Sequence, residues 1–359
     1  MPRSTARPNG NGKHADLASW RMYSQRLWGT PFATPQDVVH WLGAVQSQDY
    51  ALGKWSVAQR ADGITNNAMD RAIADGEILR THVLRPTWHF VLPSEIRWIL
   101  ALTAPRVHAL NAHRYRSLEL DEDFLAKTNV ILAGALEGGN HLTRQELAAA
   151  LNRARVDTNG QRLAYMVMHA ELDGIVCSGA PKGKRQTYGL LDERAPQSRT
   201  LDRDEALAEL AQRYFTSRGP ATLKDFLWWS SLTAADGRDA LDMVGSRLRK
   251  EVMDGRTYWF EESSPRPRSA SPVINLAQAY DERIVSYRES RDVPLGEVGM
   301  PHVVLLNGKA AGRWKPVRQK NSVGILTSLS RPLDRGEARA LDAAVERYGA
   351  FIEVPVELL

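Results

Sequence analysis

Two glutamines separated by one residue, Gln46 and Gln48, are the side chains whose type and spacing first suggest chemistry. A glutamine amide does not titrate, so the pair is not an ordinary general acid and base. Each amide donates and accepts hydrogen bonds, which suits holding a water molecule or the edge of a base. Asp49 follows directly and adds a negative charge. Without further support, the simpler interpretation is a polar helix end.

The segment before the glutamines predicts a helix that must end before they begin. Thr34 suits the N-cap and Pro35 the first helical position. The apolar stripe of this helix is Val38, Val39, Trp41, Leu42 and Val45. Side chains two residues apart point about 200° apart in a helix, but the same way in an extended segment. The glutamines therefore share a target only if the helix ends near Val45, for which Gly43 leaves room.

The rest of the chain predicts an α+β protein in which groups of helices are followed by β-hairpins. The predicted helices are residues 16–28, 35–45, 66–74, 94–113, 124–136, 144–153, 161–172, 204–216, 222–229, 234–247 and 336–347, with Ser94 as a cap and a Thr143–Glu146 capping box. The predicted strands are residues 78–84, 87–92, 175–178, 187–191, 251–252, 258–260, 273–276, 303–306, 309–314, 323–326 and 351–354.

A winged helix consists of three helices followed by a two-stranded hairpin, the wing. The predicted elements follow this order three times. We therefore expect three tandem winged helices with a C-terminal β-rich extension. The expected boundaries are residues 1–13 for a disordered tail, 14–118 for the first winged helix, 119–200 for the second, and 201–359 for the third with its extension.

The composition limits the cellular compartment and the partners that we expect. The net charge of +5 indicates a mild preference for polyanionic partners. A single cysteine, Cys177, excludes an intramolecular disulfide and argues against a zinc cluster, so we expect a reducing cytoplasm, no metal and no cofactor. No stretch is long and uncharged enough to span a membrane, so we expect no membrane partner.

Four segments in this order resemble the winged-helix DNA glycosylases of the AlkZ/YcaQ type, over about residues 17–359. The first is Gly43-Ala44-Val45-Gln46-Ser47-Gln48-Asp49 with Arg60, and the second is Leu84-Arg85-Pro86-Thr87-Trp88-His89-Phe90. The third runs from Arg213-Tyr214-Phe215 through Gly219-Pro220-Ala221-Thr222 to Asp225-Phe226 and Trp228-Trp229-Ser230. The fourth is Tyr280-Asp281-Glu282 with Tyr287 and Arg291, followed by Asn307-Gly308 and Gly312-Arg313-Trp314. A chance match to one segment is easy, but all four in order are not expected by chance.

The resemblance implies a monofunctional DNA glycosylase that hydrolyses the N-glycosidic bond of purines alkylated at N7 or N3, including bulky or crosslinked ones. Gln46 and Gln48 would be catalytic, with Ser47 where the family usually has an apolar residue. Asp49 and His89 are candidates for supporting roles. For His89 the choice lies between a DNA-side residue and a histidine satisfied at the edge of the core.

The expected partner is double-stranded alkylated DNA, bound by a nucleoid-associated, cytoplasmic monomer in a concave basic channel. The candidate DNA-binding residues are Arg85, Lys182, Lys184, Arg185, Arg313, Lys315, Arg318 and Lys320. The alternative for each is an ordinary solvated charge. For the whole protein, the alternatives are a non-catalytic winged-helix DNA-binding protein such as a transcription regulator, or an adaptor that only binds damage. A regulator would expose a recognition helix, whereas residues 161–172 have many apolar side chains.

Overall fold

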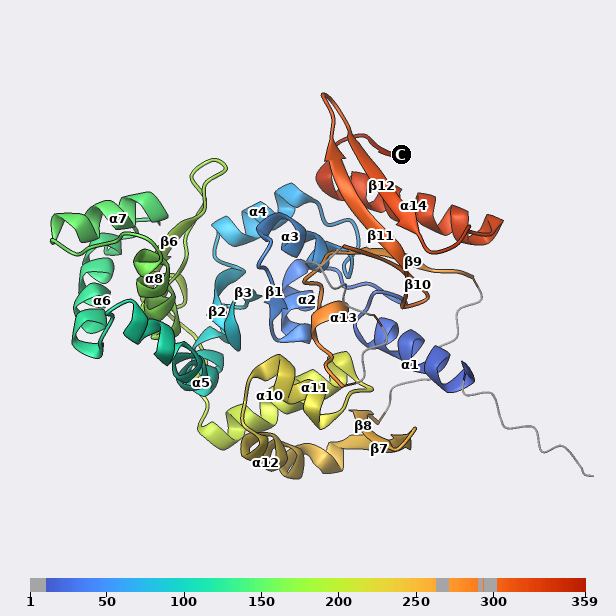
Figure 1. The fold of residues 1–359 in the computed structure, drawn as a ribbon, viewed down its shortest axis with the longest axis horizontal. Helices are drawn as coiled ribbons and strands as arrows, with labels where there is room; N and C mark the ends of the chain where they lie inside the picture. The colour runs from blue at the N-terminus through green and yellow to red at the C-terminus, as the bar shows by residue number, and fades with distance from the viewer. Residues whose placement is uncertain (1–10, 263–270, 290–292, 294–301) are drawn as a thin grey trace, which may run out of the picture.

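The chain folds as a mixed α+β protein in which one order of elements occurs three times (Figure 1). The computed structural model describes residues 11–262, 271–289, 293 and 302–359. Each repeat runs from a helix through a short strand or bridge to two more helices and a hairpin. The predicted α+β class is confirmed. The predicted tail, residues 1–13, lies largely outside the described residues.

The first unit carries the two glutamines. Its elements are α2 (Pro35–Leu42), β1 (Val45–Gln46), α3 (Tyr50–Ala58), α4 (Asn66–Ala74), β2 (Leu79–Val83) and β3 (Arg85–Val91). The strands form a sheet in the order β1-β3-β2. Helix α3 was not predicted, because residues 52–58 are all buried and show no polar face. Helix α1 (Asn11–Ser24) precedes the unit and ends four residues earlier than predicted.

The second unit follows the long helix α5 (Ile96–Ser117). Its elements are α6 (Glu122–Leu136), β4 (Leu142–Thr143), α7 (Arg144–Arg153), α8 (Arg162–Leu172), β5 (Val176–Ser178), β6 (Thr187–Leu190) and the short α9 (Leu191–Arg194). The capping box of Thr143 and Glu146 is confirmed. The predicted cap Ser94 is wrong, because Glu95 occupies the N-cap of α5 and makes no side-chain cap bond.

The third unit has the same order without a regular short strand. Its elements are α10 (Arg203–Arg218), α11 (Leu223–Ser230), α12 (Ala234–Val244), the 3₁₀ turn Gly245–Arg247, β7 (Leu248–Met253) and β8 (Arg256–Glu261). An antiparallel bridge between Ala221 and Trp259 stands where β1 and β4 stand in the other units. Asp254 and Gly255 form the turn of this hairpin, with φ of 50° and 74°, the positive values that a tight hairpin turn requires.

The C-terminal part is a five-stranded sheet with one helix. Its elements are β9 (Ile274–Ala277), α13 (Glu282–Val285), β10 (Val303–Leu306), β11 (Lys309–Arg318), β12 (Val323–Leu329), α14 (Arg335–Ile352) and β13 (Val356–Leu358). The strand order is β13-β12-β11-β10-β9, and both edge strands contact α14, so the sheet curls around that helix. The strand predicted at residues 351–354 is wrong, because α14 continues through Ile352.

The hydrophobic cores show that the first unit lies at the centre (Figure 1). Its Val38 and Val45 share a core with Trp314 and other residues of the C-terminal sheet and α14. Its β2 and helix α5 share another core with the third unit. The second unit has a core of its own. Among the described helices, none combines the length and apolarity needed to cross a membrane.

A buried ion pair joins the first unit to α13. Arg60 donates to both carboxylate oxygens of Asp281, at 2.9 and 2.7 Å, and neither side chain is exposed. The guanidinium also donates to the backbone oxygens of Gln25 and Ser56 and to the side-chain oxygen of Gln25. Such a pair contributes little when intact but costs much when one charge is left alone.

We predict that Asp281→Asn lowers the free energy of unfolding by about 3–5 kcal/mol, since it leaves Arg60 buried without a counter-charge. Urea unfolding of the full chain measures this loss. The control is Lys224→Ala, which removes an exposed pair with Glu289 and should change stability by less than about 1 kcal/mol. Equal, small losses in both variants would contradict the prediction.

Candidate active site

Helix α2 ends before the glutamines, as the hypothesis of a shared target requires. Thr34 accepts a hydrogen bond from the Asp37 N–H at the start of the helix. At its end Gly43 has a φ of 71°, a conformation that glycine adopts without strain. Gln46 then pairs in antiparallel fashion with His89 of β3, and the Ser47 N–H donates to the Trp88 oxygen at 2.8 Å. Gln46 therefore lies in a short extended strand, and Gln48 follows two residues later, just beyond the hydrogen bond of Ser47 to β3.

Ser47, between the two glutamines, is fully buried. Arg80 donates to the Ser47 carbonyl oxygen at 3.0 Å and, at 3.3 Å, to its hydroxyl oxygen. Helix α3 packs so closely here that a Cβ on Gly53 would lie 2.9 Å from the Ser47 Cα. The Ser47 hydroxyl thus has a charged partner, and Arg80 and helix α3 hold the backbone between the two glutamines.

The two glutamine side chains differ in burial. Gln46 is only 5% exposed, and its amide oxygen accepts a 2.6 Å hydrogen bond from Arg85. Gln48 is exposed, and its amide oxygen accepts a long, 3.4 Å bond from the Trp88 N–H. One amide is therefore fixed in orientation, and the other is loosely held at the surface beside it.

Behind Gln46 lies a buried carboxylate, that of Glu282. One of its oxygens accepts from the Gln46 N–H at 2.8 Å. The other accepts from Arg218, Trp229 and Ser286 at 2.7, 3.0 and 2.9 Å. Burial alone would raise the pKa of Glu282, but the charges of Arg218 and Arg85 outweigh it and hold this pKa at about 2. The group is thus an anion at neutral pH.

Arg218 also holds the turn that precedes β1. Its guanidinium donates to the backbone oxygens of Leu42 and Ala44, at 2.8 and 3.1 Å. The end of α2 and the start of β1 are therefore both held by α10. Asp281, Glu282 and Tyr287 of the fourth family-like segment are buried, and Tyr287 donates to the Arg218 oxygen at 2.8 Å. Arg291 of the same segment lies outside the described residues.

His89, carried as a possible DNA-side residue, is completely buried in this structure. Burial, reinforced by the Arg85 charge, lowers the pKa of His89 to about 3, so the ring is neutral. Its Nδ1 lies 2.9 Å from the Thr87 oxygen. The alternative, a histidine satisfied in the core, is confirmed.

Asp49 acts locally as a helix cap. Its carboxylate accepts from the Leu52 N–H at 3.0 Å and begins α3. This contact stabilises the exit from the glutamine segment. Asp49 stays a candidate for a supporting role near the sugar, but its carboxylate already has a structural partner.

Most of the candidate DNA-binding residues are exposed, as phosphate contacts require. Arg313 and Lys315 project from one side of β11, and the buried Trp314 lies between them. Arg318 and Lys320 flank the turn after β11, and Lys184 and Arg185 lie at the tip of the second hairpin. Lys182 is paired with Glu146 at 2.9 Å. Arg85 differs from these residues, because it is partly buried and bonded to Gln46.

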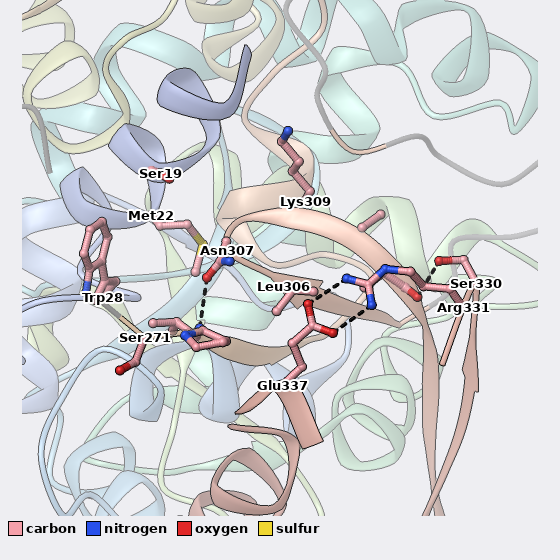
Figure 2. A pocket seen from close by; sticks show the side chains of 14 residues that line it. Ser19, Met22, Trp28, Ser271, Leu306, Asn307, Lys309, Ser330, Arg331 and Glu337 are labelled. Atoms are coloured by element: carbon pink, nitrogen blue, oxygen red, sulfur yellow. Dashed lines mark hydrogen bonds and ion pairs between the residues drawn. The ribbon is translucent and has the colours of Figure 1, made fainter. Parts of the chain in front are cut away.

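A cavity of about 620 Å³ lies elsewhere, between α1, the C-terminal sheet and the start of α14 (Figure 2). Its lining includes Trp28, Lys309 and the ion pair of Arg331 with Glu337. None of the predicted site residues lines it. At the glutamine segment itself, Gln48 is exposed at the surface and Gln46 is buried.

The sequence matches the AlkZ-like DNA glycosylase family over residues 39–351. The chain therefore belongs to this family of DNA glycosylases. It is 26% identical to an interstrand DNA cross-link repair glycosylase of Streptomyces sahachiroi, over 95% of this chain and 98% of that protein. The solved structure of the DNA glycosylase AlkZ of Streptomyces sahachiroi shares its fold, with a TM-score of 0.79 at 22% identity, over 96% of this chain and 99% of that one.

The sequence did not predict that Arg85, Arg218 and Glu282 hold the glutamine segment. Arg218 lies within the third family-like segment but was not singled out, and the contact between Glu282 and Gln46 joins residues 236 positions apart. The available signal was a set of opposite charges within apolar, family-like segments. Such charges need partners when buried, although their spacing does not say which.

We predict that Arg85→Met slows base release about 10- to 100-fold, as expected when one hydrogen bond to a charged group, of about 1.5–3 kcal/mol, disappears. The amide of Gln46 would then be free to rotate. Single-turnover release at saturating enzyme measures this step apart from DNA affinity.

The control is Arg71→Met, an exposed arginine on α4 of the same unit, which should leave the rate unchanged. A variant that binds DNA more weakly but releases base at the normal saturated rate would make Arg85 a DNA contact and not a holder of Gln46.

Proposed function

We propose that this AlkZ-like glycosylase hydrolyses the N-glycosidic bond of purines alkylated at N7 or N3, using a water molecule positioned by Gln46 and Gln48. The observation that carries the proposal is the fixed amide of Gln46, held by Arg85 and by the Glu282 contact to its backbone. The exposed amide of Gln48 follows two residues later in the chain. One rigid and one accessible amide suit a water that must be aimed.

The chemistry explains why amides suffice. A purine alkylated at N7 or N3 already carries positive charge and leaves without protonation. The transition state is then a sugar cation, and the attacking water needs orientation more than deprotonation. Orientation can contribute several kcal/mol to lowering the barrier. Of the ionisable groups behind Gln46, His89 is neutral and Glu282 is ionised throughout the neutral range, so neither changes charge there.

The substrates we propose include bulky and crosslinked purines. The similar Streptomyces sahachiroi protein is an interstrand DNA cross-link repair glycosylase and matches nearly the whole chain. Gln48 lies at the surface and not in a closed cavity, so a bulky adduct need not be enclosed. This differs from enzymes that flip a base into a tight pocket.

We further propose that the three units are winged helices and that duplex DNA crosses the first. The repeated order of helix, strand, two helices and hairpin supports the assignment. The hairpin loops of β5–β6 and β11–β12 extend toward the same edge of the molecule, on either side of α3 and α4 (Figure 1). Both loops carry exposed lysine and arginine, which suits contacts to phosphates along one path.

The central prediction concerns the glutamines. Gln46→Ala and Gln48→Ala should each slow release of 7-methylguanine from methylated duplex DNA by at least about 100-fold, because each removes part of the water's orientation. The control is Gln36→Ala, on α2 of the same unit, which should not affect the rate. Normal release by both variants would refute the mechanism, although not the membership of the family.

The DNA path has a separate test in the salt dependence of binding. A variant with glutamine at Lys184, Arg185, Arg318 and Lys320 should bind duplex DNA more weakly. The slope of log affinity against log salt should fall by about 0.9 for each phosphate that the variant no longer neutralises. The control replaces Arg335 and Arg339, two exposed arginines of α14, with glutamine. Equal slopes for both variants and the unchanged protein would exclude the proposed path.

A further inference from the structure

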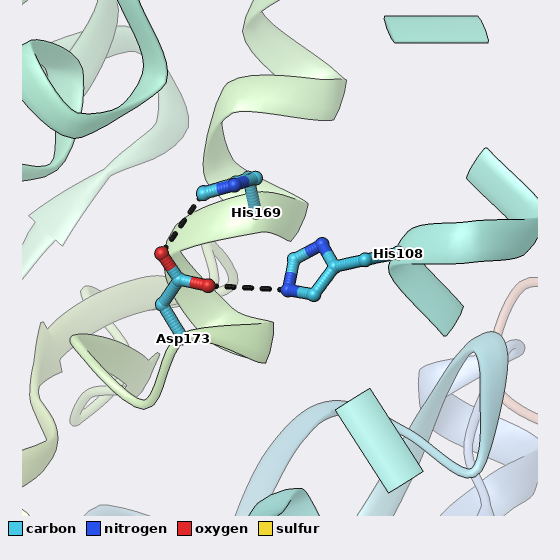
Figure 3. Close-up of side chains that lie close together, drawn as sticks. All are labelled: His108, His169 and Asp173. Carbon is cyan, nitrogen blue, oxygen red and sulfur yellow. Dashed lines mark ion pairs between the residues drawn. The ribbon is translucent and has the colours of Figure 1, made fainter. Parts of the chain in front are cut away.

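Two histidines and an aspartate meet between α5 and α8, away from the glutamines (Figure 3). His108 comes from α5, His169 from the last turn of α8, and Asp173 caps that helix. The His108 Nε2 lies 3.1 Å from one oxygen of Asp173, and the His169 Nδ1 lies 3.2 Å from the other. One nitrogen or oxygen from each residue can be chosen so that all three lie within 4.8 Å of one another.

We propose that His108, His169 and Asp173 form a binding site for a divalent transition-metal ion, with Zn²⁺ the best match. Bonds of about 2.0–2.1 Å in a tetrahedral site place neighbouring ligand atoms about 3.3 Å apart. Each histidine nitrogen lies near this distance from one oxygen of Asp173, although the two oxygens differ, and three ligand atoms, one from each residue, lie within 4.8 Å of one another. Two imidazoles select this class of ion over Mg²⁺ and Ca²⁺, which prefer oxygen ligands alone. The site uses no cysteine, so the single cysteine of the chain gives no indication of it.

Neighbouring side chains could orient the ligands. The hydroxyl of Tyr115 lies 3.1 Å from the His108 Nδ1. With metal on Nε2, the ring would carry its proton on Nδ1 and donate it to Tyr115, the usual outer contact of a ligating histidine. Asn129 of α6 donates to Asp173 at 2.7 Å, and its own amide oxygen is buried without a hydrogen bond in the described part of the chain. A water on the metal would offer that oxygen a donor.

One side of the site opens into a groove, and the site lies between two helices that a metal ion would link. His108 and Asp173 line a groove of about 320 Å³ whose other walls are mostly apolar. A fourth coordination position therefore has room for water. The apolar cluster at this junction is small, with Ala104, Val107 and Leu172 as its buried members. A metal would bridge α5, which follows the first unit, to α8 of the second and strengthen a thin interface.

The test uses the full chain without a histidine tag, freed of metal by a chelator and titrated with ZnCl₂ by calorimetry. We expect one tight equivalent of Zn²⁺. Loss of an outer partner of a metal ligand typically weakens metal binding about 10- to 100-fold, so His108→Gln, His169→Gln and Asp173→Asn should each weaken it by more than about 100-fold. His113→Gln, an exposed histidine on the same helix, should bind normally. Absence of a stoichiometric equivalent in the unchanged protein would overturn the proposal.

A second measurement covers variants that fold poorly. Co²⁺ added to the metal-free, unchanged protein should give the intense visible absorption of a tetrahedral site, and Zn²⁺ should abolish it. Zn²⁺ should also raise the melting temperature of the unchanged protein and of His113→Gln, but not that of the three ligand variants, because only a bound ion stabilises the fold. An equal rise in all five proteins, or only the weak absorption of hydrated Co²⁺, would refute the site.

Discussion

The buried carboxylate of Glu282 is the interaction on which the glutamine site depends. An ion removed from water is tolerated only when it is paired and its oxygens are hydrogen-bonded. Arg218 supplies the charge, and Trp229 and Ser286 supply donors. The remaining oxygen accepts from the Gln46 backbone. The strand that carries the glutamines is thus one of the partners that make this buried charge tolerable, which couples the geometry of the site to the stability of the fold.

This coupling explains why the first unit shares its cores with other parts of the chain. Strand β1 has only two residues, and a pair of residues in a ladder has little stability of its own. Its position is set by β3 on one side, by Gly53 and Arg80 behind Ser47, and by α10 and α13 behind Gln46. Elements distant in the sequence therefore fix the backbone of this short strand, while Gln48 stays exposed beside it.

Signals within a few residues predicted most of the helices. Features that depend on residues distant in the sequence were not predicted. Thr34 and Thr143 were correct caps, because a cap is decided within four residues. Helix α3 was missed because burial on all sides erases the amphipathic pattern. The extended glutamine segment was predictable, since only that geometry lets both amides face one target. Their unequal burial and the contact with Glu282 were not, because partners more than 200 residues away set them.

The unequal burial also bears on why a second glutamine is present at all. A fully fixed amide, such as that of Gln46 with its 2.6 Å bond from Arg85, has already committed part of its accepting capacity. An amide oxygen has two lone pairs, so one remains for a water. A single bond does not fix a water's direction, whereas a second acceptor nearby does. In the mechanism that we propose, Gln48, which is loosely held by Trp88, adjusts to the substrate, while Gln46 supplies the fixed reference for the water.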